Sequence, residues 1–181
     1  KFGRSLNIKG TVYITGGEAS DGLVNFFIEI DHSFNCKVLK GMDFKRSGHN
    51  AVNVNNSKIV VISGAYGEKS CEYFDFEKNC WYRLPNINID RVGSSALVYN
   101  SEEIFCFFGK NYDIPNKNWI FVDAVEKINL VGKYPQWEII SLKNKTFPYN
   151  KKRSFASFVT FPSDKILIIG GQIQKDDGEV C

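Results

Sequence analysis

A short pattern, in which an apolar strand runs into glycine, occurs four times and constrains the fold more than any other feature. The glycines that end these strands are separated by 48, 45 and 61 residues. A repeat of roughly 40–50 residues is typical of small β-sheets arranged around an axis. A second glycine follows in the first and last occurrence, so that the glycine positions are Gly16, Gly17, Gly64, Gly109, Gly170 and Gly171.

Each repeat is interpreted as four short strands, because runs of β-branched and aromatic residues alternate with Gly, Asn, Asp and Pro. No helical periodicity is evident. The second unit is expected to hold strands at 49–55, 58–64, 71–76 and 81–84. The third is expected to hold strands at 95–100, 103–109, 119–130 and 137–142, with a long loop over 110–118.

The two terminal units are expected to be incomplete. The first is predicted to enter at its second strand and to continue through 26–30 and 36–39. The fourth is predicted to give its first two strands, 155–161 and 165–169. The second strands are apolar on successive residues, as expected for strands covered on both faces. We therefore expect further repeats outside these 181 residues.

An arginine stands ahead of the apolar second strand in the second, third and fourth units. An aromatic-Asp pair and a tryptophan follow that strand in the second unit, and a tryptophan follows it in the third. These residues include Arg46, Arg91 and Arg153, Phe74-Asp75, Trp81 and Trp137. Their order resembles the kelch repeat of β-propellers, and about three and a half repeats are present. The resemblance implies an all-β, kelch-type β-propeller fragment of four-stranded antiparallel blades, in which the glycines and both tryptophans are structural. The expected blades, all part of one larger propeller domain, are 1–45 (strands b–d), 46–90, 91–152 with a long b–c loop, and the start of a further blade at 153–181.

Composition disfavours several classes of function. The net charge of +3, with lysines spread along the chain, does not indicate a basic surface for binding nucleic acid. Five cysteines without C-x-x-C spacing argue against a zinc site and fit reduced thiols in a cytoplasmic protein. No apolar run approaches 18 residues, so no membrane span is expected. We expect neither a metal nor another cofactor.

Candidate partner-binding residues lie in the loops at one end of the expected sheets. Arginines at the start of kelch units bind acidic partner segments in some members, because the guanidinium matches a carboxylate. The alternative is that these arginines bond carbonyls and carboxylates within the propeller. Exposed tyrosines in the loops after the second strands would anchor a partner, or would simply cover their own loops. The candidates are Arg46, Arg91, Arg153, Tyr66, Glu68, Asn111 and Tyr112.

The resemblance implies a non-catalytic protein-interaction module, acting as a scaffold or partner-recognition domain in a larger protein or assembly. A cytoskeletal or ciliary assembly is one such setting. A substrate-receptor domain of a ubiquitin ligase is the alternative role. A copper radical oxidase on a similar propeller is disfavoured, because the only histidines are His32 and His49 and the motifs of that class are missing. We therefore expect no enzymatic activity.

Overall fold

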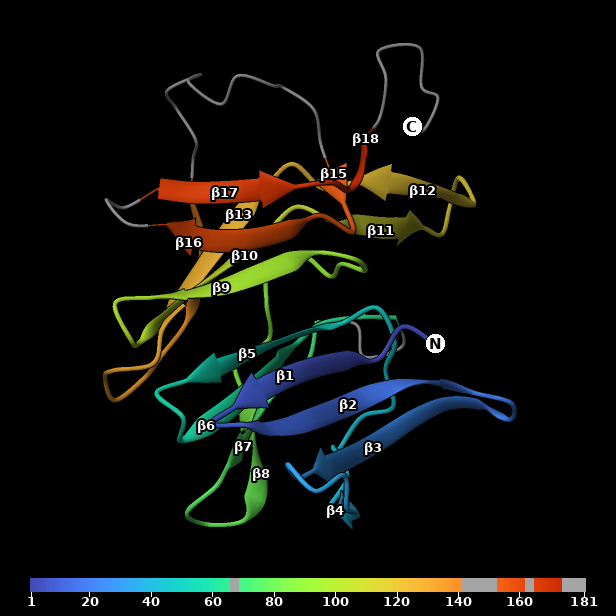
Figure 1. Cartoon of the computed structure of the whole chain (residues 1–181). Coiled ribbons are helices and arrows are strands. Elements are labelled where there is room, and N and C mark those ends of the chain that lie inside the picture. The colour runs from blue at the N-terminus through green and yellow to red at the C-terminus, as the bar shows by residue number, and fades with distance from the viewer. Residues whose placement is uncertain (66–68, 141–152, 162–164, 174–181) are drawn as a thin grey trace.

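The structure is a computed structural model that describes residues 1–65, 69–140, 153–161 and 165–173. The described residues form β-strands, turns and loops, with no helix among them. Three four-stranded antiparallel sheets follow one another along the chain, and shorter strand pairs complete the structure (Figure 1). The expectation of an all-β protein built from four-stranded antiparallel sheets is confirmed at this level.

The first sheet contains one strand more than the sequence pattern indicated. Residues Arg4–Ile8 form a first strand that pairs antiparallel with the second, so this unit is not missing its first strand. Alternation of exposed Ser5 and Asn7 with less exposed neighbours gives this short segment its two faces. The strand order is β1 (Arg4–Ile8), β2 (Thr11–Ala19), β3 (Gly22–Ile30) and β4 (Cys36–Leu39).

The second sheet follows the sequence prediction closely. Its second strand is completely apolar after Lys58, and the residues from Ile59 to Ile62 have no exposed surface. Both faces of this strand are therefore covered, as its continuous apolar run requires. The order is β5 (Asn50–Val54), β6 (Lys58–Ile62), β7 (Cys71–Asp75) and β8 (Cys80–Leu84).

The third sheet contains a long insertion between its second and third strands. The insertion was expected to be a loop over 110–118, but it forms a separate antiparallel hairpin of β11 (Lys110–Asp113) and β12 (Asn118–Phe121). The third strand therefore begins at Val125, not at Trp119. The sheet order is β9 (Ser95–Tyr99), β10 (Glu103–Phe107), β13 (Val125–Asn129) and β14 (Trp137–Ile140).

The fourth unit begins with the expected strands. Its first two long strands pair antiparallel, with Phe158 opposite Ile168. Two short strands at its entry and exit pair with one another, Ser154 opposite Gln172. The strands are β15 (Arg153–Ser154), β16 (Ser157–Phe161), β17 (Lys165–Ile169) and β18 (Gln172–Ile173).

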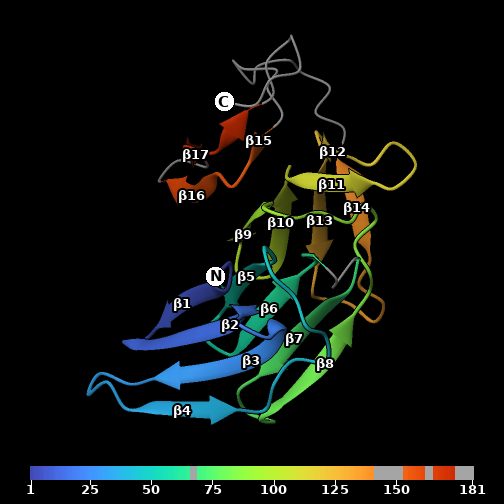
Figure 2. The ribbon, with the colours of Figure 1, turned by 90° about the vertical axis from the view of Figure 1, so that its right-hand side faces the viewer.

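The sheets fan out from their first strands, which lie beside one another as β1, β5, β9 and β16. The fourth strands β4, β8 and β14 lie at the periphery (Figure 2). A backbone hydrogen-bond ladder joins equivalent residues of successive units. Gly48 N–H donates to Phe2 O at 3.0 Å, Gly93 N–H to Gly48 O at 2.8 Å, and Phe155 N–H to Gly93 O at 2.6 Å. All four residues have φ between 55° and 62°. Equivalent residues of the four successive units are therefore aligned along one line.

Apolar clusters fill the spaces between successive sheets. One face of each sheet packs on the opposite face of the next. Trp81 lies between the first and second sheets, with its ring centroid 5.3 Å from that of Phe27. Trp137 lies between the second and third sheets. The indole N–H of each tryptophan donates to a carbonyl that precedes its own unit, Lys40 O for Trp81 and Pro85 O for Trp137.

Backbone angles correct the alignment of the glycine repeat by one residue. Gly64 and Gly109, with φ of 106° and 103°, correspond to the second glycine of a pair. Ser63 and Phe108 then occupy the first position. At Gly64 a Cβ would lie 2.7 Å from His49 Cβ and 2.9 Å from Ser47 O, so close approach selects glycine there. The equivalent glycines are Gly17, Gly64, Gly109 and Gly171.

Candidate functional site

Arg46 lies in the interior, where it completes a hydrogen-bonded network in the second sheet. Its Nη1 donates to Ser63 O at 2.7 Å and Ser70 O at 3.0 Å. Its Nη2 donates to Glu72 Oε1 at 2.7 Å, and both side chains of this ion pair are fully buried. Burial lowers the pKa of Arg46, and the carboxylate of Glu72 opposes that effect. Because the charges are paired and hydrogen-bonded, the network can exist away from water.

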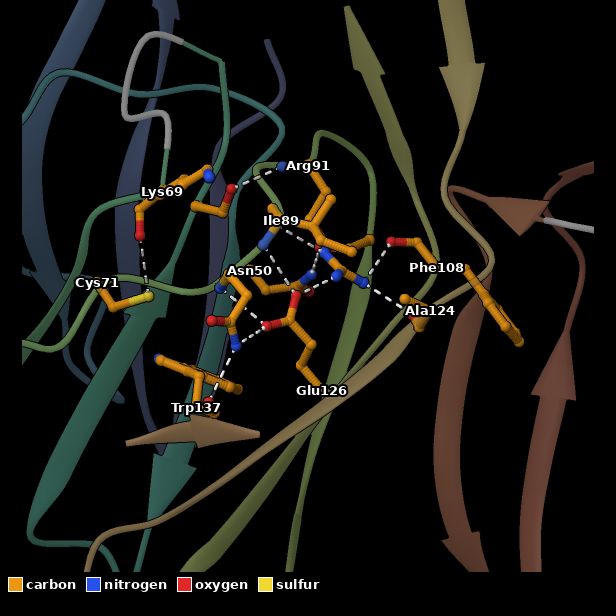
Figure 3. A network of polar contacts seen from close by, with 12 residues as sticks. Asn50, Lys69, Cys71, Ile89, Arg91, Phe108, Ala124, Glu126 and Trp137 are labelled. Carbon is orange, nitrogen blue, oxygen red and sulfur yellow. Dashed lines mark hydrogen bonds and ion pairs between the residues drawn. The ribbon is translucent and has the colours of Figure 1, made fainter. Parts of the chain in front are cut away.

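Arg91 repeats this arrangement in the third sheet (Figure 3). Its Nη1 donates to Phe108 O at 3.1 Å and Ala124 O at 2.9 Å. Its Nη2 forms a buried ion pair with Glu126. Glu126 also accepts from the backbone N–H groups of Asn88 and Ile89, in the segment that precedes the arginine. Each network therefore fastens the chain entering a unit to the third strand of that unit.

The burial of these two arginines corrects the prediction that they contact a partner. Arg46 and Arg91 are 0% and 1% exposed. Their guanidinium groups are enclosed by carbonyls and a carboxylate of their own unit, which is the alternative that the sequence left open. The expected acidic segment is supplied from within the chain, by Glu72 and Glu126.

Arg153 occupies the same repeat position but has different surroundings. Its Nη1 donates to Gly170 O at 2.8 Å, at an exposed site. Gly170 O is the equivalent of Ser63 O and Phe108 O in the earlier units. This is the one side-chain hydrogen bond of Arg153 to the described residues. Arg153 is half-buried, and its hydrogen bond lies at the surface, unlike those of Arg46 and Arg91.

The hairpin of β11 and β12 carries a cluster of exposed aromatic and aliphatic side chains. Tyr112 and Trp119 are directly opposite in the register, with ring centroids 5.3 Å apart, and they are 45% and 51% exposed. Ile114 and Ile120 are also exposed, whereas the predicted Asn111 is half-buried. Sequence reasoning found Tyr112 but missed Trp119, because it placed that residue in a core strand.

The base of this hairpin is anchored to the rest of the chain. Phe121 is buried, and Lys110 Nζ lies 4.4 Å from the centre of its ring. Lys110 Nζ also donates to Gln172 Oε1 at 2.9 Å, which joins the hairpin to β18. Backbone hydrogen bonds between Lys110 and Val92 fix the first strand of the hairpin to the entry of the third unit. The exposed cluster thus stands on a fixed base.

Tyr66 and Glu68 lie outside the described residues. His49 is buried and its Nε2 lies 2.9 Å from Thr15 Oγ1. Burial lowers the pKa of His49 to about 3, and the charges of Arg46 and Arg4 act in the same direction. Burial likewise raises the pKa of the Cys71 thiol to about 12, which leaves it protonated and unreactive.

In the part of the chain that the structure describes, no group of three or more His, Cys, Asp or Glu side chains is placed to hold a metal ion. The same residues contain no helix long and apolar enough to cross a membrane.

The fold has counterparts among solved structures. One, described as the structure of YjhT, aligns with 100% of this chain and 83% of its own length, with a TM-score of 0.68 and 12% sequence identity. YjhT is a propeller-type protein. No family model and no curated protein matches the chain. At 12% identity the likeness concerns the fold alone, and this chain is therefore similar to a propeller-type protein in the arrangement of its sheets.

Proposed function

We propose that this chain is part of a kelch-type β-propeller that binds a protein partner and has no catalytic role. The proposal of a propeller is supported by the fan of four-stranded sheets, by the repeated backbone ladder and by the likeness to YjhT. The kelch type is supported by the recurring Arg–Glu network and by the two buried tryptophans. Such a module serves as a scaffold or recognition domain in a larger assembly.

The exposed hairpin cluster is the observation that carries the binding function. Tyr112 and Trp119 present adjacent aromatic surfaces on a hairpin whose base is fixed by Phe121 and Lys110. Tryptophan and tyrosine dominate the binding energy of protein interfaces, because they bury a large area at a small cost in conformational entropy. Ile114 in the hairpin turn is exposed as well, whereas Ile120 is exposed on the opposite face of the hairpin from Tyr112 and Trp119. We assign the hairpin cluster as the main partner-binding surface.

The test is photo-crosslinking in cells with a reactive amino acid placed at Tyr112 or at Tyr134. Tyr134 is also exposed but lies in the connection between β13 and β14, away from the hairpin. A specific partner should crosslink from position 112 and not from position 134. Trp119→Ala should then weaken the purified complex by at least about tenfold. Equal crosslinking from both positions, or affinity unchanged by Trp119→Ala, would contradict the assignment.

A further inference from the structure

The three tryptophans of this chain have two kinds of environment. Trp81 and Trp137 are buried between sheets, and the indole N–H of each donates to a backbone carbonyl. Trp119 on β12 is 51% exposed, and its indole N–H has no hydrogen-bond acceptor among the described residues. The same is true of the hydroxyl of Tyr112, directly opposite on β11. The hairpin therefore presents two aromatic rings together with two donors that the described part of the chain does not use.

The two rings are set at an angle to one another instead of forming one flat surface. Their centroids are 5.3 Å apart, and their planes differ by 65°. A compact apolar group can therefore contact both rings at once. The tip of the hairpin points away from β16 and β17 (Figures 1 and 2), so these two strands do not cover it.

The area of the aromatic pair favours a short segment over a folded domain as its occupant. A completely buried tyrosine or tryptophan contributes about 150–250 Å². Because about half of each side chain is exposed, the pair offers roughly 200 Å². A stable interface between folded proteins, a dimer of this chain included, buries about 800 Å² on each side. Ile120 cannot enlarge the pair, because it lies on the opposite face of the hairpin.

A polyproline II segment has the properties that this surface requires. Its backbone makes no internal hydrogen bonds, so its carbonyls can accept from the indole N–H of Trp119 and the hydroxyl of Tyr112. Its proline rings are compact and apolar, and proline-rich segments bind to exposed aromatic side chains in several kinds of domain. Because the helix is preformed, binding costs little conformational entropy, which matters where the contact area is small.

Lys110 adds a positive charge beside the aromatic pair. It lies two residues before Tyr112 on β11, and therefore on the same face of the hairpin. Its ammonium group lies 4.4 Å from the centre of the Phe121 ring and donates to Gln172, a neutral amide. It forms no ion pair with a described carboxylate. Because an ammonium group has three donors, a carboxylate of the bound segment can accept from one that Gln172 does not use.

We propose that the face of the β11–β12 hairpin carrying Tyr112 and Trp119 binds a proline-rich segment of a partner protein, with an acidic residue of that segment at Lys110. Residues two apart on a strand are about 7 Å apart, and a polyproline helix rises about 3 Å per residue. The acidic residue is therefore expected about two or three positions from the proline that contacts the rings. This proposal rests on the partner-binding function proposed above and names the chemical class of the partner.

Three fluorescein-labelled peptides provide the probes, and fluorescence anisotropy measures their affinity for the 181-residue chain. The first is Glu-Ala-Pro-Pro-Pro-Pro-Ala-Glu, with an acidic residue at each end because a polyproline helix can bind in either direction. The second has alanine in place of every proline and should bind at least about tenfold more weakly, because it loses the preformed helix and the proline rings. The third has glutamine in place of both glutamates and should bind about two- to fivefold more weakly, because an exposed ion pair is lost.

Variants of the hairpin locate the binding site. Trp119→Ala should weaken binding of the first peptide by at least about tenfold. Trp119→Phe keeps an aromatic ring but removes the indole N–H, and should weaken binding by about two- to tenfold. Lys110→Gln should weaken binding of the first peptide and leave that of the glutamine peptide unchanged. Ile120→Ala, on the opposite face of the same hairpin, is the matched control and should leave the affinity unchanged. Circular dichroism checks that each variant is folded.

Several results would overturn the proposal. The first is a proline peptide that does not bind, or binds no better than the alanine peptide. The second is an affinity that Trp119→Ala leaves unchanged. A preference for glutamate that persists in Lys110→Gln would exclude the acidic contact. A dimer that forms with increasing concentration and is abolished by Trp119→Ala would identify a second copy of this chain as the occupant.

The two proposals for the hairpin can fail separately. A partner that crosslinks from position 112, although the proline peptide does not bind, would leave the hairpin as the partner-binding surface and exclude only a proline-rich segment. Peptide binding that Trp119→Ala abolishes, without any partner crosslinked in cells, would support the chemistry of the surface and contradict its use there.

Discussion

The second and fourth sheets have the same kind of side chains at equivalent positions, yet these are buried in one sheet and exposed in the other. Val60 and Ile62 of β6 have no exposed surface, because the third sheet packs on them. Leu167 and Ile169 of β17 are 48% and 53% exposed. The difference shows that repeat position determines the residue type, whereas burial depends on the next sheet. A single sheet is therefore not a complete stabilising unit.

The same comparison applies to the arginines. In the second and third sheets the charge is enclosed and neutralised, and the network stabilises the fold. In the fourth sheet Arg153 is half-buried and donates to Gly170 O at an exposed site. One repeat position is thus enclosed where the described residues include all four strands of the unit, and is less buried where they include only part of it.

Removing the carboxylate from a buried arginine–glutamate network should have the largest effect on the free energy of unfolding. Glu126→Gln leaves the buried guanidinium of Arg91 without a counter-charge, which costs about 3–5 kcal/mol. The matched control is Glu138→Gln, an exposed position on β14 of the same sheet, which should change stability by less than about 0.5 kcal/mol. Urea denaturation followed by tryptophan fluorescence measures both. Equal losses would show that the Arg91 network is not a distinct source of stability.

Alanine substitution at the equivalent positions Ile62 and Ile169 directly tests the comparison between the second and fourth sheets. Ile62→Ala should destabilise the protein by about 2–5 kcal/mol, because it creates a cavity between two sheets. Ile169→Ala should cost less than about 1 kcal/mol, because its side chain is already half exposed. Thermal unfolding of the two variants against the wild type gives the difference. A large loss for Ile169→Ala would mean that the fourth sheet is covered in solution.

Substitution of a repeat glycine separates backbone strain from steric collision. Gly109 and Gly132 both have positive φ, 103° and 129°, so alanine is strained at both by about 1–3 kcal/mol. Only at Gly109 does a Cβ also approach backbone atoms, Val92 O and Ser94 N at 3.0 Å. Gly109→Ala should therefore lower the melting temperature more than Gly132→Ala. The reverse order would contradict the close approach at the second glycine of the pair.

His49 should make stability depend on pH where the first two sheets meet. Its pKa in the folded protein is about 3, below the ordinary value near 6.5, so the unfolded chain binds the proton more readily. Stability is then lost as pH falls below about 6.5, at a rate approaching about 1.4 kcal/mol per pH unit. His49→Asn should remove this part of the slope, as measured by urea denaturation between pH 7 and pH 5. An unchanged slope would place the acid sensitivity in the carboxylates.

Much of the fold could be predicted because its local signals are strong. Continuous apolar runs such as 59–62, followed by glycine, identify strands covered on both faces. The glycine alignment was off by one because a sequence does not show φ, and Ser63 and Phe108 adopt the angle that glycine favours. The first strand was missed because only two apolar residues alternate in Arg4–Ile8.

The site was less predictable, because its geometry depends on distant residues. Glu72 and Glu126 lie 26 and 35 residues after their arginines, and one sequence does not reveal that they pair. The recurrence of a glutamate directly after Cys71 and after Val125 was the signal that could have found them. The hairpin was missed for a related reason. It is an insertion without a counterpart in the other units, so the repeat pattern does not predict its structure.

Amide hydrogen exchange of the 181-residue chain tests the central claim most directly. That claim is that each sheet is stabilised by the sheet packed on it. Amides of β6 and β10 should exchange slowly, whereas those of β17, which has a half-exposed face and one strand partner among the described residues, should exchange faster by orders of magnitude. Equal protection of β6, β10 and β17 would contradict the account.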